Sequence, residues 1–281
     1  MAFTLYNAPQ STCSQRVRSV LNAKGLAFDE VKLNLLDGDQ LKPDYLKLNP
    51  NGVVPTLDHD GQIVIDSTVI AEYLDEVEPA ASFTPENPVW RARMRALMHF
   101  IDEMPAAAVR VPTFNLAFLP RFQKMSREDF VAMAESKPLR REFMLTMGQT
   151  GFPQAEMDAA LGRLRRAYER MDAEIAASGG PWLLGERITL ADVAMMPALV
   201  RMHDLGMPDW QDLPRVAAWF DNIRAEPAFA PTFYSGSLLS ERFPHLKSKP
   251  QIAAELVPSP TPNIRVYSRL SWAKVEGAGV Q

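Results

Sequence analysis

The sequence predicts two domains of different class: an α/β N-terminal domain over residues 1–78 and an all-α C-terminal domain over residues 89–235. Strand and helix patterns alternate in the first segment, whereas apolar residues recur almost only at helical spacing in the second. Prolines cluster in residues 79–88, which indicates a linker. Residues 236–281 are rich in proline and show no sustained period, so we expect an extended C-terminal tail.

The first half of the N-terminal domain has the pattern strand, helix, strand, irregular helix. Residues 3–6 and 28–33 are typical of short strands. Between them, residues 16–24 carry apolar side chains at helical spacing, and Gly25 follows where a helix end favours a left-handed backbone. Residues 37–48 predict a less regular helix.

A hairpin and a closing helix complete this domain. The Asp60-Gly61 pair, between residues 55–58 and 63–65, is typical of a two-residue β-turn. Residues 66–74 then return to helical spacing. A β-α-β unit followed by a helix, a hairpin and a last helix is the thioredoxin-like arrangement.

The C-terminal domain is predicted to contain five helical segments, roughly residues 88–110, 127–147, 153–178, 189–205 and 213–225. Pro105 and Pro197 fall inside two of these segments and should kink or end them. The apolar residues 111–120 are bracketed by prolines and predict a loop or helix break over a pocket. Thr189 and Asp192 have the spacing of a helix-capping pair, so we assign Asp192 a structural role.

Composition argues against several classes of function. The net charge is −4 and no basic tract is present, so no nucleic-acid partner is expected. Cys13 is the only cysteine, which excludes an internal disulfide, and no apolar run approaches the roughly 20 residues that span a bilayer. His59, His99, His203 and His245 lack metal-ligand spacing, so no metal site is expected. With no signal-peptide core at the N-terminus, we expect a cytoplasmic protein without a membrane partner.

Residues 49–57 carry the strongest functional signal. Pro55 cannot donate to a central strand ladder, so the Val54-Pro55 pair predicts a sheet edge where the backbone of Val54 can pair with an extended peptide. Asp66 and Ser67 open the next helix, whose free N–H groups favour a carboxylate. Together these features predict a site for a small acidic peptide, and glutathione is the peptide we expect.

Residues 10–16 join the first strand to the first helix, at the sheet edge where ligands of α/β proteins bind. A free thiol is only about 3% ionised at pH 7, and lowering its pKa by about two units requires about 2.7 kcal/mol. One hydrogen bond to a charged group supplies about 1.5–3 kcal/mol, and the start of a helix adds to it. Ser14 and Ser11 are therefore candidates to activate the thiol; the alternative is that they only cap the helix.

The place of Cys13 in this turn puts it beside a bound glutathione. Cys13 begins a Cys-x-x-Cys pattern whose second cysteine is absent, and such a site would form a mixed disulfide with glutathione through one thiol. Because no resolving cysteine exists, we favour a small, half-buried hydrophobic role for this side chain. Gln40 and Lys42 are candidates to bind the glycyl carboxylate of glutathione.

These motifs together resemble those of the cytosolic glutathione transferases over nearly all of residues 3–230. The shared features are the thioredoxin-like domain, a Val-Pro pair that is cis in that family, an acidic residue and a serine opening the third helix, and a Gly-x-x-x-Thr-x-Ala-Asp sequence starting at Gly185. The resemblance implies a glutathione transferase (GST) fold, glutathione as co-substrate and a homo- or heterodimer.

Two subgroups of that superfamily compete. Residues 11–18 are similar to the Ser-Ser-Cys-x-x-Arg-Val-Arg stretch of the zeta class, which isomerises maleylacetoacetate, although threonine replaces the second serine here. Residues 66–74 and 151–154 look closer to the bacterial lignin β-aryl etherases, and the second motif lies in an insertion that most classes lack. That group often has Asn-Ser where this chain has Cys13-Ser14, which leaves the activating donor open.

The etherase resemblance implies that glutathione thiolate attacks a carbon next to a ketone and displaces an aryloxy group. The products would be a glutathione thioether and a phenol, and the substrate a small aromatic ether. Five side chains are candidates for the pocket walls, with ordinary core packing as the alternative: Phe100, Met104, Val111, Phe114 and Phe118.

Two other functions stay open. A zeta-type isomerase would bind a small diacid and would need cationic residues in its pocket, for which Arg16 and Arg110 are the candidates. A transferase-like subunit that supports a partner chain would instead bind glutathione weakly or not at all.

Overall fold

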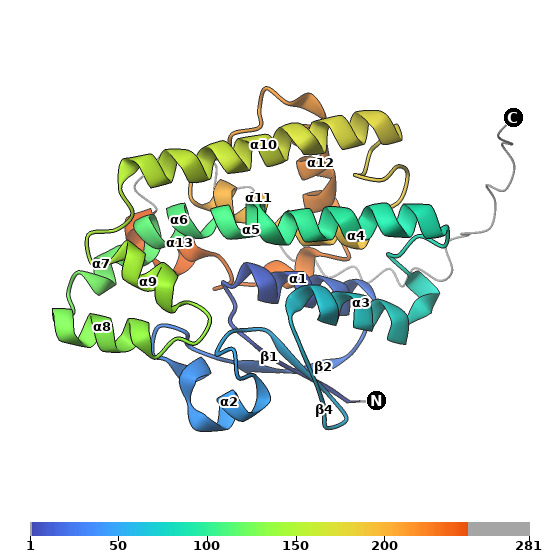
Figure 1. The fold of residues 1–281 in the computed structure, drawn as a ribbon. Helices are drawn as coiled ribbons and strands as arrows, with labels where there is room; N and C mark the ends of the chain where they lie inside the picture. The colour runs from blue at the N-terminus through green and yellow to red at the C-terminus, as the bar shows by residue number, and fades with distance from the viewer. Residues whose placement is uncertain (1, 247–281) are drawn as a thin grey trace, which may run out of the picture.

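Four strands form one mixed sheet in the first part of the molecule (Figure 1). The structure is a computed structural model that describes residues 2–246, and the strands are β1 (Phe3–Asn7), β2 (Phe28–Lys32), β3 (Thr56–His59) and β4 (Gln62–Ile65). Their order is β2-β1-β3-β4, with β1 and β2 parallel and the other neighbours antiparallel. The predicted thioredoxin-like sheet is therefore confirmed.

Helices cover both faces of this sheet (Figure 1). The helices α1 (Thr12–Ala23) and α3 (Ser67–Val77) lie between the sheet and the helical domain, and α2 (Pro43–Leu48) lies on the opposite face. Leu57 of the sheet and Ile70 of α3 are fully buried in the core between them. A 3₁₀ turn over residues 39–41 precedes α2, so the irregular helix predicted here is confirmed as two short pieces.

The turns have the backbone that the sequence predicts. Gly25 follows α1 with φ of 64°, and the hairpin residues Asp60 and Gly61 have φ of 50° and 84°. The Val54–Pro55 peptide bond is cis. These are local features, set by residues that tolerate or require such a backbone.

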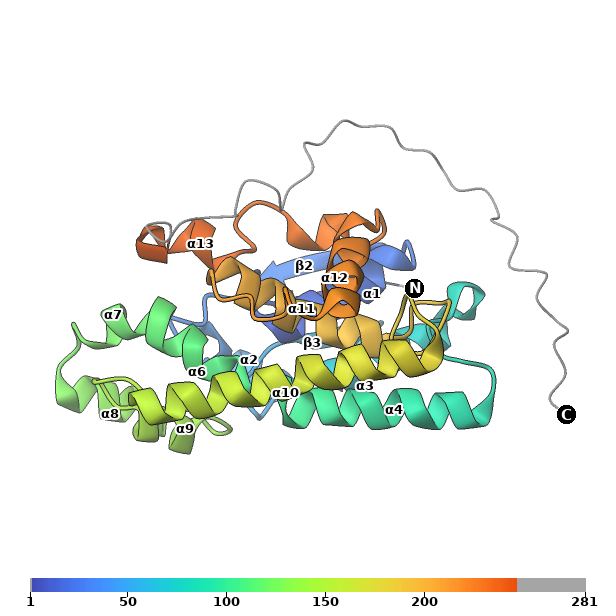
Figure 2. The same cartoon turned by 90° about the horizontal axis from the view of Figure 1, so that it is seen from above.

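The second part of the described chain is helical (Figures 1 and 2). Its α-helices are α4 (Pro88–Glu103), α5 (Pro105–Ala108), α6 (Arg110–Thr113), α7 (Leu119–Phe122), α8 (Arg127–Glu135), α9 (Arg141–Met147), α10 (Gln154–Ser178), α11 (Leu190–Asp204), α12 (Pro214–Ala225) and α13 (Leu239–Arg242). Short 3₁₀ turns occupy residues 79–81, 230–233 and 244–246. Helix α11 is buried almost throughout and contacts both α1 and α4, so it joins the two domains.

The prolines had different effects from one helix to the next. Pro105 separates α4 from α5, as predicted, whereas α11 continues through Pro197 to Asp204. Of the loop or helix break predicted over residues 111–120, the loop is wrong, because this stretch is helical. A π-helical turn at Phe114–Phe118 interrupts the α-helix, and the stretch borders a cavity. Its prolines fall in the short helices α6 and α7, near starts where a missing N–H costs little.

The extended tail predicted from residue 236 is wrong over residues 236–246. Residues 236–246 are not extended but form α13 and a 3₁₀ turn. The carboxylate of Asp204 holds this segment, since it accepts hydrogen bonds from the backbone N–H of Leu239 at 2.7 Å and of Ser240 at 3.3 Å. Because these residues lie 35 positions apart in the chain, no local sequence pattern predicts the contact. Residues 247–281 of the predicted tail lie outside the described residues.

Within residues 2–246, no helix combines the length and the apolar character that crossing a membrane requires. The same residues contain no cluster of side chains suited to a metal ion.

Candidate active site

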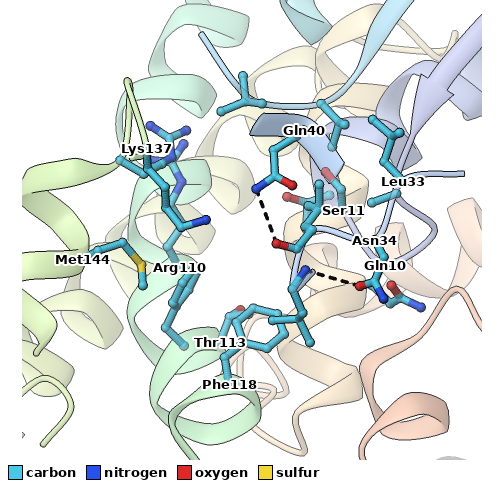
Figure 3. A pocket seen from close by; sticks show the side chains of 18 of the residues that line it. Gln10, Ser11, Leu33, Asn34, Gln40, Arg110, Thr113, Phe118, Lys137 and Met144 are labelled. Carbon is cyan, nitrogen blue, oxygen red and sulfur yellow. Dashed lines mark hydrogen bonds between the residues drawn. The ribbon is translucent and has the colours of Figure 1, made fainter. Parts of the chain in front are cut away.

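A cavity of about 270 Å³ opens between the end of the sheet and the helical domain. One wall comes from the N-terminal domain and includes residues 10–13, 33–36 and 51–54. The facing wall comes from α6, the π-helical turn and the α8–α9 region, and α13 adds a side. Figure 3 shows Ser11 and Gln40 on one side of this space and Arg110 and Lys137 across from them.

The turn before α1 places Ser11, Thr12 and Cys13 half-buried at the cavity. Ser11 is the N-cap of α1, and its Oγ accepts a hydrogen bond from the backbone N–H of Ser14 at 3.3 Å. The capping alternative thus describes Ser11 in this structure, although the side chain also borders the cavity. Its position at the positive end of α1 suits the stabilisation of an anion.

Ser14, predicted as a candidate to activate the thiol, does not face the cavity. It is fully buried, lies outside the cavity lining, and its Oγ accepts a hydrogen bond from the backbone N–H of Ala8 at 3.3 Å. The reason is helical geometry: Ser11 and the first two residues of α1 border the cavity, while position 14 points into the domain core.

The segment before β3 borders the cavity, and we call it the Val54 edge. It is not the sheet edge that the sequence predicted, because β3 lies between β1 and β4 and pairs with both. Val54 lines the cavity, and among residues 2–246 its backbone N–H and C=O have no hydrogen-bond partner. The neighbouring carbonyl of Val53 is different, since it accepts bonds from the Tyr45 hydroxyl at 2.6 Å and from Asn49 Nδ2 at 3.0 Å. Pro55 is buried behind the edge and does not line the cavity.

Asp66 and Ser67 lie at the start of α3, outside the cavity lining. The Asp66 carboxylate caps the helix by accepting from the backbone N–H of Thr68 at 2.9 Å. Ser67 is buried, and its Oγ accepts from Arg16 Nη1 at 3.3 Å. Arg16 also forms a 2.7 Å ion pair with Asp102, so it joins α1 to α4 and does not reach the cavity.

The two candidates for the glycyl carboxylate differ in position. Gln40 lines the cavity, is buried, and donates from Nε2 to the Leu35 carbonyl at 3.3 Å, while its Oε1 has no partner in the described part of the chain. Lys42 lies outside the lining, and its exposed ammonium pairs with Asp39 at 2.7 Å.

The helical wall is aromatic at its base. Phe114 and Phe118 line the cavity, as predicted, with ring centroids 4.9 Å apart in an edge-to-face arrangement. Phe122 and Phe243 extend this surface. A flat, apolar wall of this kind suits an aromatic ligand.

The other three predicted wall residues lie elsewhere. Phe100 stacks against the Arg170 guanidinium at 4.1 Å, Met104 ends α4, and Val111 is buried in the core. None of them lines the cavity, because each faces away from it on its own helix. The core-packing alternative describes Val111, whose side chain belongs to the main hydrophobic cluster.

A set of basic side chains, which the sequence-based analysis largely missed, also surrounds the cavity. These are Arg110, Arg121, Lys137, Arg140, Arg201 and Arg242. No Asp or Glu of the described residues lines it. The six positions are scattered from α6 to α13, so nothing in the sequence marks them as a group except the Lys-Pro-Leu-Arg stretch at residues 137–140.

Burial lowers the pKa of two of these groups. Burial, together with the nearby Arg110, lowers the pKa of Arg140 to about 10. Burial lowers the pKa of Arg201 to about 10, although Asp204 opposes the shift. Cys13 is close enough to both guanidinium groups that a thiolate there would favour their charged forms. The cavity therefore has a positive potential next to the start of α1.

Comparison with known proteins assigns the family. The model of the glutathione S-transferase N-terminal domain matches residues 10–77, and that of the C-terminal domain matches residues 154–222. The maleylacetoacetate isomerase maiA of Aspergillus fumigatus is 32% identical over 201 residues, which cover 70% of this chain and 75% of that protein. This chain belongs to the glutathione S-transferase family. Glutathione is the co-substrate of that family, as predicted, and the GST fold is confirmed.

This transferase is also similar to the protein LigF of Sphingobium sp., at 28% identity over 242 residues covering 83% of this chain and 93% of that protein. The crystal structure of the β-etherase LigF matches with a TM-score of 0.73 and 29% identity, covering 83% of this chain and 99% of that one. A glutathione transferase homologue from sulfitobacter with bound glutathione shares the fold at a TM-score of 0.60 and 22% identity, covering 82% of this chain and 96% of that one.

Proposed function

We propose that this transferase cleaves β-aryl ethers with glutathione. The thiolate attacks the carbon that bears the aryloxy group, next to a ketone; the C–S bond forms, the C–O bond breaks, and the phenolate leaves and takes up a proton. The observation that carries the proposal is the aromatic wall of Phe114 and Phe118 in the cavity that Ser11 also lines. The match to LigF supports it, because it covers 83% of the chain, whereas the match to the isomerase maiA covers 70%.

The residues of the N-terminal wall have distinct roles in this proposal. The free backbone of Val54 pairs with the cysteinyl unit of glutathione, and Gln40 binds its glycyl end. Asp66 and Ser67, with the start of α3, hold the γ-glutamyl end. Ser11 faces the sulfur, since it is the predicted serine that borders the cavity.

Catalysis in this scheme depends on position and on thiol ionisation. A phenolate is a fair leaving group, so no strong general acid is required. The helix start at Ser11 and the positive potential around the cavity favour a thiolate. Alignment of the thiolate with the ether carbon supplies much of the remaining rate.

The direct test is incubation with glutathione and a β-aryloxy ketone whose phenol is fluorescent once released. We expect phenol release that depends on both glutathione and enzyme, with one glutathione thioether formed per phenol. A reaction without glutathione serves as the control. Absence of release, with glutathione binding intact by calorimetry, would refute the etherase assignment.

A zeta-type isomerase is the second candidate, and one observation favours it. The basic lining of the cavity suits a small diacid, and the isomerase maiA is among the similar proteins. Of the two cations predicted for this role, Arg110 lines the cavity, whereas Arg16 is engaged by Asp102. Turnover of a maleyl substrate to its fumaryl isomer, without phenol release, would select this function.

A supporting subunit without activity is the third candidate, and calorimetric titration with glutathione separates it from both enzymes. We also propose a homo- or heterodimer in a reducing, cytoplasmic setting. Val69 of α3 and Val89 and Trp90 at the start of α4 are exposed apolar residues that a partner subunit would cover. Light scattering coupled to size exclusion reports the assembly directly.

A further inference from the structure

Three cations of the cavity have no carboxylate partner among residues 2–246. They are Arg110 on α6 and Lys137 and Arg140 in the turn between α8 and α9, a group we call the basic wall. The side chains of Arg110 and Lys137 have no hydrogen-bond partner within that part of the chain. Arg140 donates only to the adjacent Leu139 carbonyl at 3.3 Å.

The next residue, Arg141, shows that carboxylates are present nearby and pair with a cation outside the cavity. Arg141 contacts both Glu135 and Glu142, the nearest carboxylates of α8 and α9, and all three lie at the exposed surface. Arg140, one position earlier, lines the cavity and forms no ion pair with Glu135 or Glu142. Other cations that border the cavity do have partners: Arg121 pairs with Asp37 at 3.1 Å, and Arg242 donates to Asn34 at 2.9 Å.

Partly buried cations without a counterion are costly, and the cost is recovered when an anion binds among them. Burial lowers the pKa of Lys137 and, together with Arg110, that of Arg140, which agrees with charges held close together without compensation. Planar guanidinium groups are suited to bind a carboxylate through two hydrogen bonds.

Glutathione does not account for the basic wall if it binds along the Val54 edge. Figure 3 shows Arg110 and Lys137 across the cavity from Gln40 and Ser11, which belong to the proposed glutathione wall. The carboxylates of glutathione would lie along that first wall, near Gln40 and the start of α3. The basic wall therefore borders the space left for the second substrate.

We infer that the second substrate is an aromatic carboxylate, whose ring lies on Phe114 and Phe118 and whose carboxylate is bound by Arg140, Lys137 and Arg110. This inference rests on the proposed function and specifies its substrate class: an aryl ether that carries a carboxylate. A neutral ether would leave the charges of the basic wall without a counterion. The same chemistry excludes cationic aromatic substrates.

The test uses para-phenoxybenzoate and its amide, para-phenoxybenzamide, as probes of equal shape and different charge. Each is titrated calorimetrically into wild-type protein, with and without glutathione, and glutathione is titrated separately. We expect the benzoate to bind about tenfold or more tightly than the amide, because a charged hydrogen bond is replaced by a neutral one. The titration with glutathione reports on the proposed function independently of the basic wall.

Variants locate the effect. Arg140→Gln and Lys137→Met should each remove most of the preference for the benzoate, by weakening benzoate binding more than amide binding, and should leave the separately measured binding of glutathione unchanged. Arg141→Gln is the matched control, since its side chain is exposed and engaged by Glu135 and Glu142, and it should retain the preference. Circular dichroism and thermal unfolding establish that each variant is folded.

The outcomes separate the two claims. Equal affinity for benzoate and amide, or a preference that survives both basic-wall variants, overturns the inference even if glutathione binds. If wild-type protein does not bind glutathione, the proposed function is refuted. A benzoate preference that depends on Arg140 would even then support an anion site in this cavity. A preference seen equally in Arg141→Gln and lost in Arg140→Gln supports the inference.

Discussion

The Tyr45 hydroxyl donates a 2.6 Å hydrogen bond to the carbonyl oxygen of Val53, one residue before the free backbone of Val54. Asn49 donates to the same oxygen, and both side chains are buried. Because both donors bind the carbonyl of Val53, this segment is fixed in place, while the N–H and C=O of Val54 remain free within residues 2–246. Side chains from α2 and its C-terminal end therefore orient a surface that they do not themselves form.

Removal of the Tyr45 hydroxyl tests this arrangement. Tyr45→Phe should lower the free energy of unfolding by about 1–2 kcal/mol, since it leaves buried acceptors with fewer partners. The KM for glutathione should rise severalfold with kcat at saturation unchanged, as measured by steady-state kinetics and thermal unfolding. Tyr73→Phe is the control, because its hydroxyl bonds to His59 at 2.6 Å, away from the cavity. An unaltered KM in Tyr45→Phe would show that the edge needs no such support.

Ser11 should carry the effect on the thiol. Ser11→Ala is expected to raise the pKa of bound glutathione by about one unit and to lower kcat about tenfold at neutral pH, through loss of one charged hydrogen bond. The helix cap is lost as well, at about 1 kcal/mol of stability. Ser11→Thr keeps a hydroxyl for both the thiolate and the helix cap, so its thiol pKa and stability should be close to those of wild type.

Ser14→Ala is the contrasting variant, since its hydroxyl is buried beside Ala8. The pKa of the glutathione thiol in this variant should equal that in wild type, as measured by the ultraviolet absorbance of the thiolate. A raised pKa in Ser14→Ala and not in Ser11→Ala would reverse the assignment of the two serines.

Ser67→Ala should raise the KM for glutathione. Its Oγ accepts from Arg16, and the start of α3 is the proposed site of the γ-glutamyl end. The loss of one hydrogen bond to a charged ligand group corresponds to about a tenfold increase, at unchanged kcat. An unchanged KM would place glutathione elsewhere.

A buried ion pair makes stability depend on acid pH. Lys24 and Asp75 meet at 2.8 Å with side chains 0% and 2% exposed. Burial by itself would raise the pKa of Asp75, but hydrogen bonds from Lys24, the Phe83 backbone and Ser82 outweigh it and hold that pKa below its ordinary value. The stabilisation is therefore complete above pH ~4 and is lost as the pH falls through the folded-state pKa.

Asp75→Asn should lower the free energy of unfolding by about 3 kcal/mol at neutral pH, because it leaves the Lys24 charge buried and unpaired. The difference from wild type should shrink in acid, where the wild-type carboxylate is protonated too. Denaturant unfolding across pH measures it. Asp44→Asn, at an exposed pair with Lys47, should differ from wild type by less than about 1 kcal/mol at any pH.

Asp204 should control the α13 side of the cavity. It accepts from the backbone of Leu239, and Leu239 and Phe243 line the cavity. Asp204→Asn weakens this anchor, so the KM for the aromatic substrate should rise while glutathione affinity, measured by calorimetry, stays the same. Equal weakening of both would indicate a general loss of structure.

The sequence alone determined what depends on neighbours along the chain. The strand and helix order and the turns at Gly25 and Asp60-Gly61 each depend on a few adjacent residues, and the structure agrees with them. The sheet edge predicted at Val54 is wrong, because the partners of β3 are set by the pairing of distant strands. The aromatic wall was only half predictable, because Phe114 and Phe100 have similar local patterns and differ in which way their helices face.

Only the tertiary structure decided the choice between Ser11 and Ser14, the burial of Arg16 against Asp102, and the folding of residues 236–246 onto Asp204. The basic wall belongs to the same class, since Arg110 and Arg140 become neighbours only when α6 meets the α8–α9 turn. Side-chain direction and long-range contacts are set by packing between elements, and no local pattern in the sequence records which charges that packing leaves without a partner.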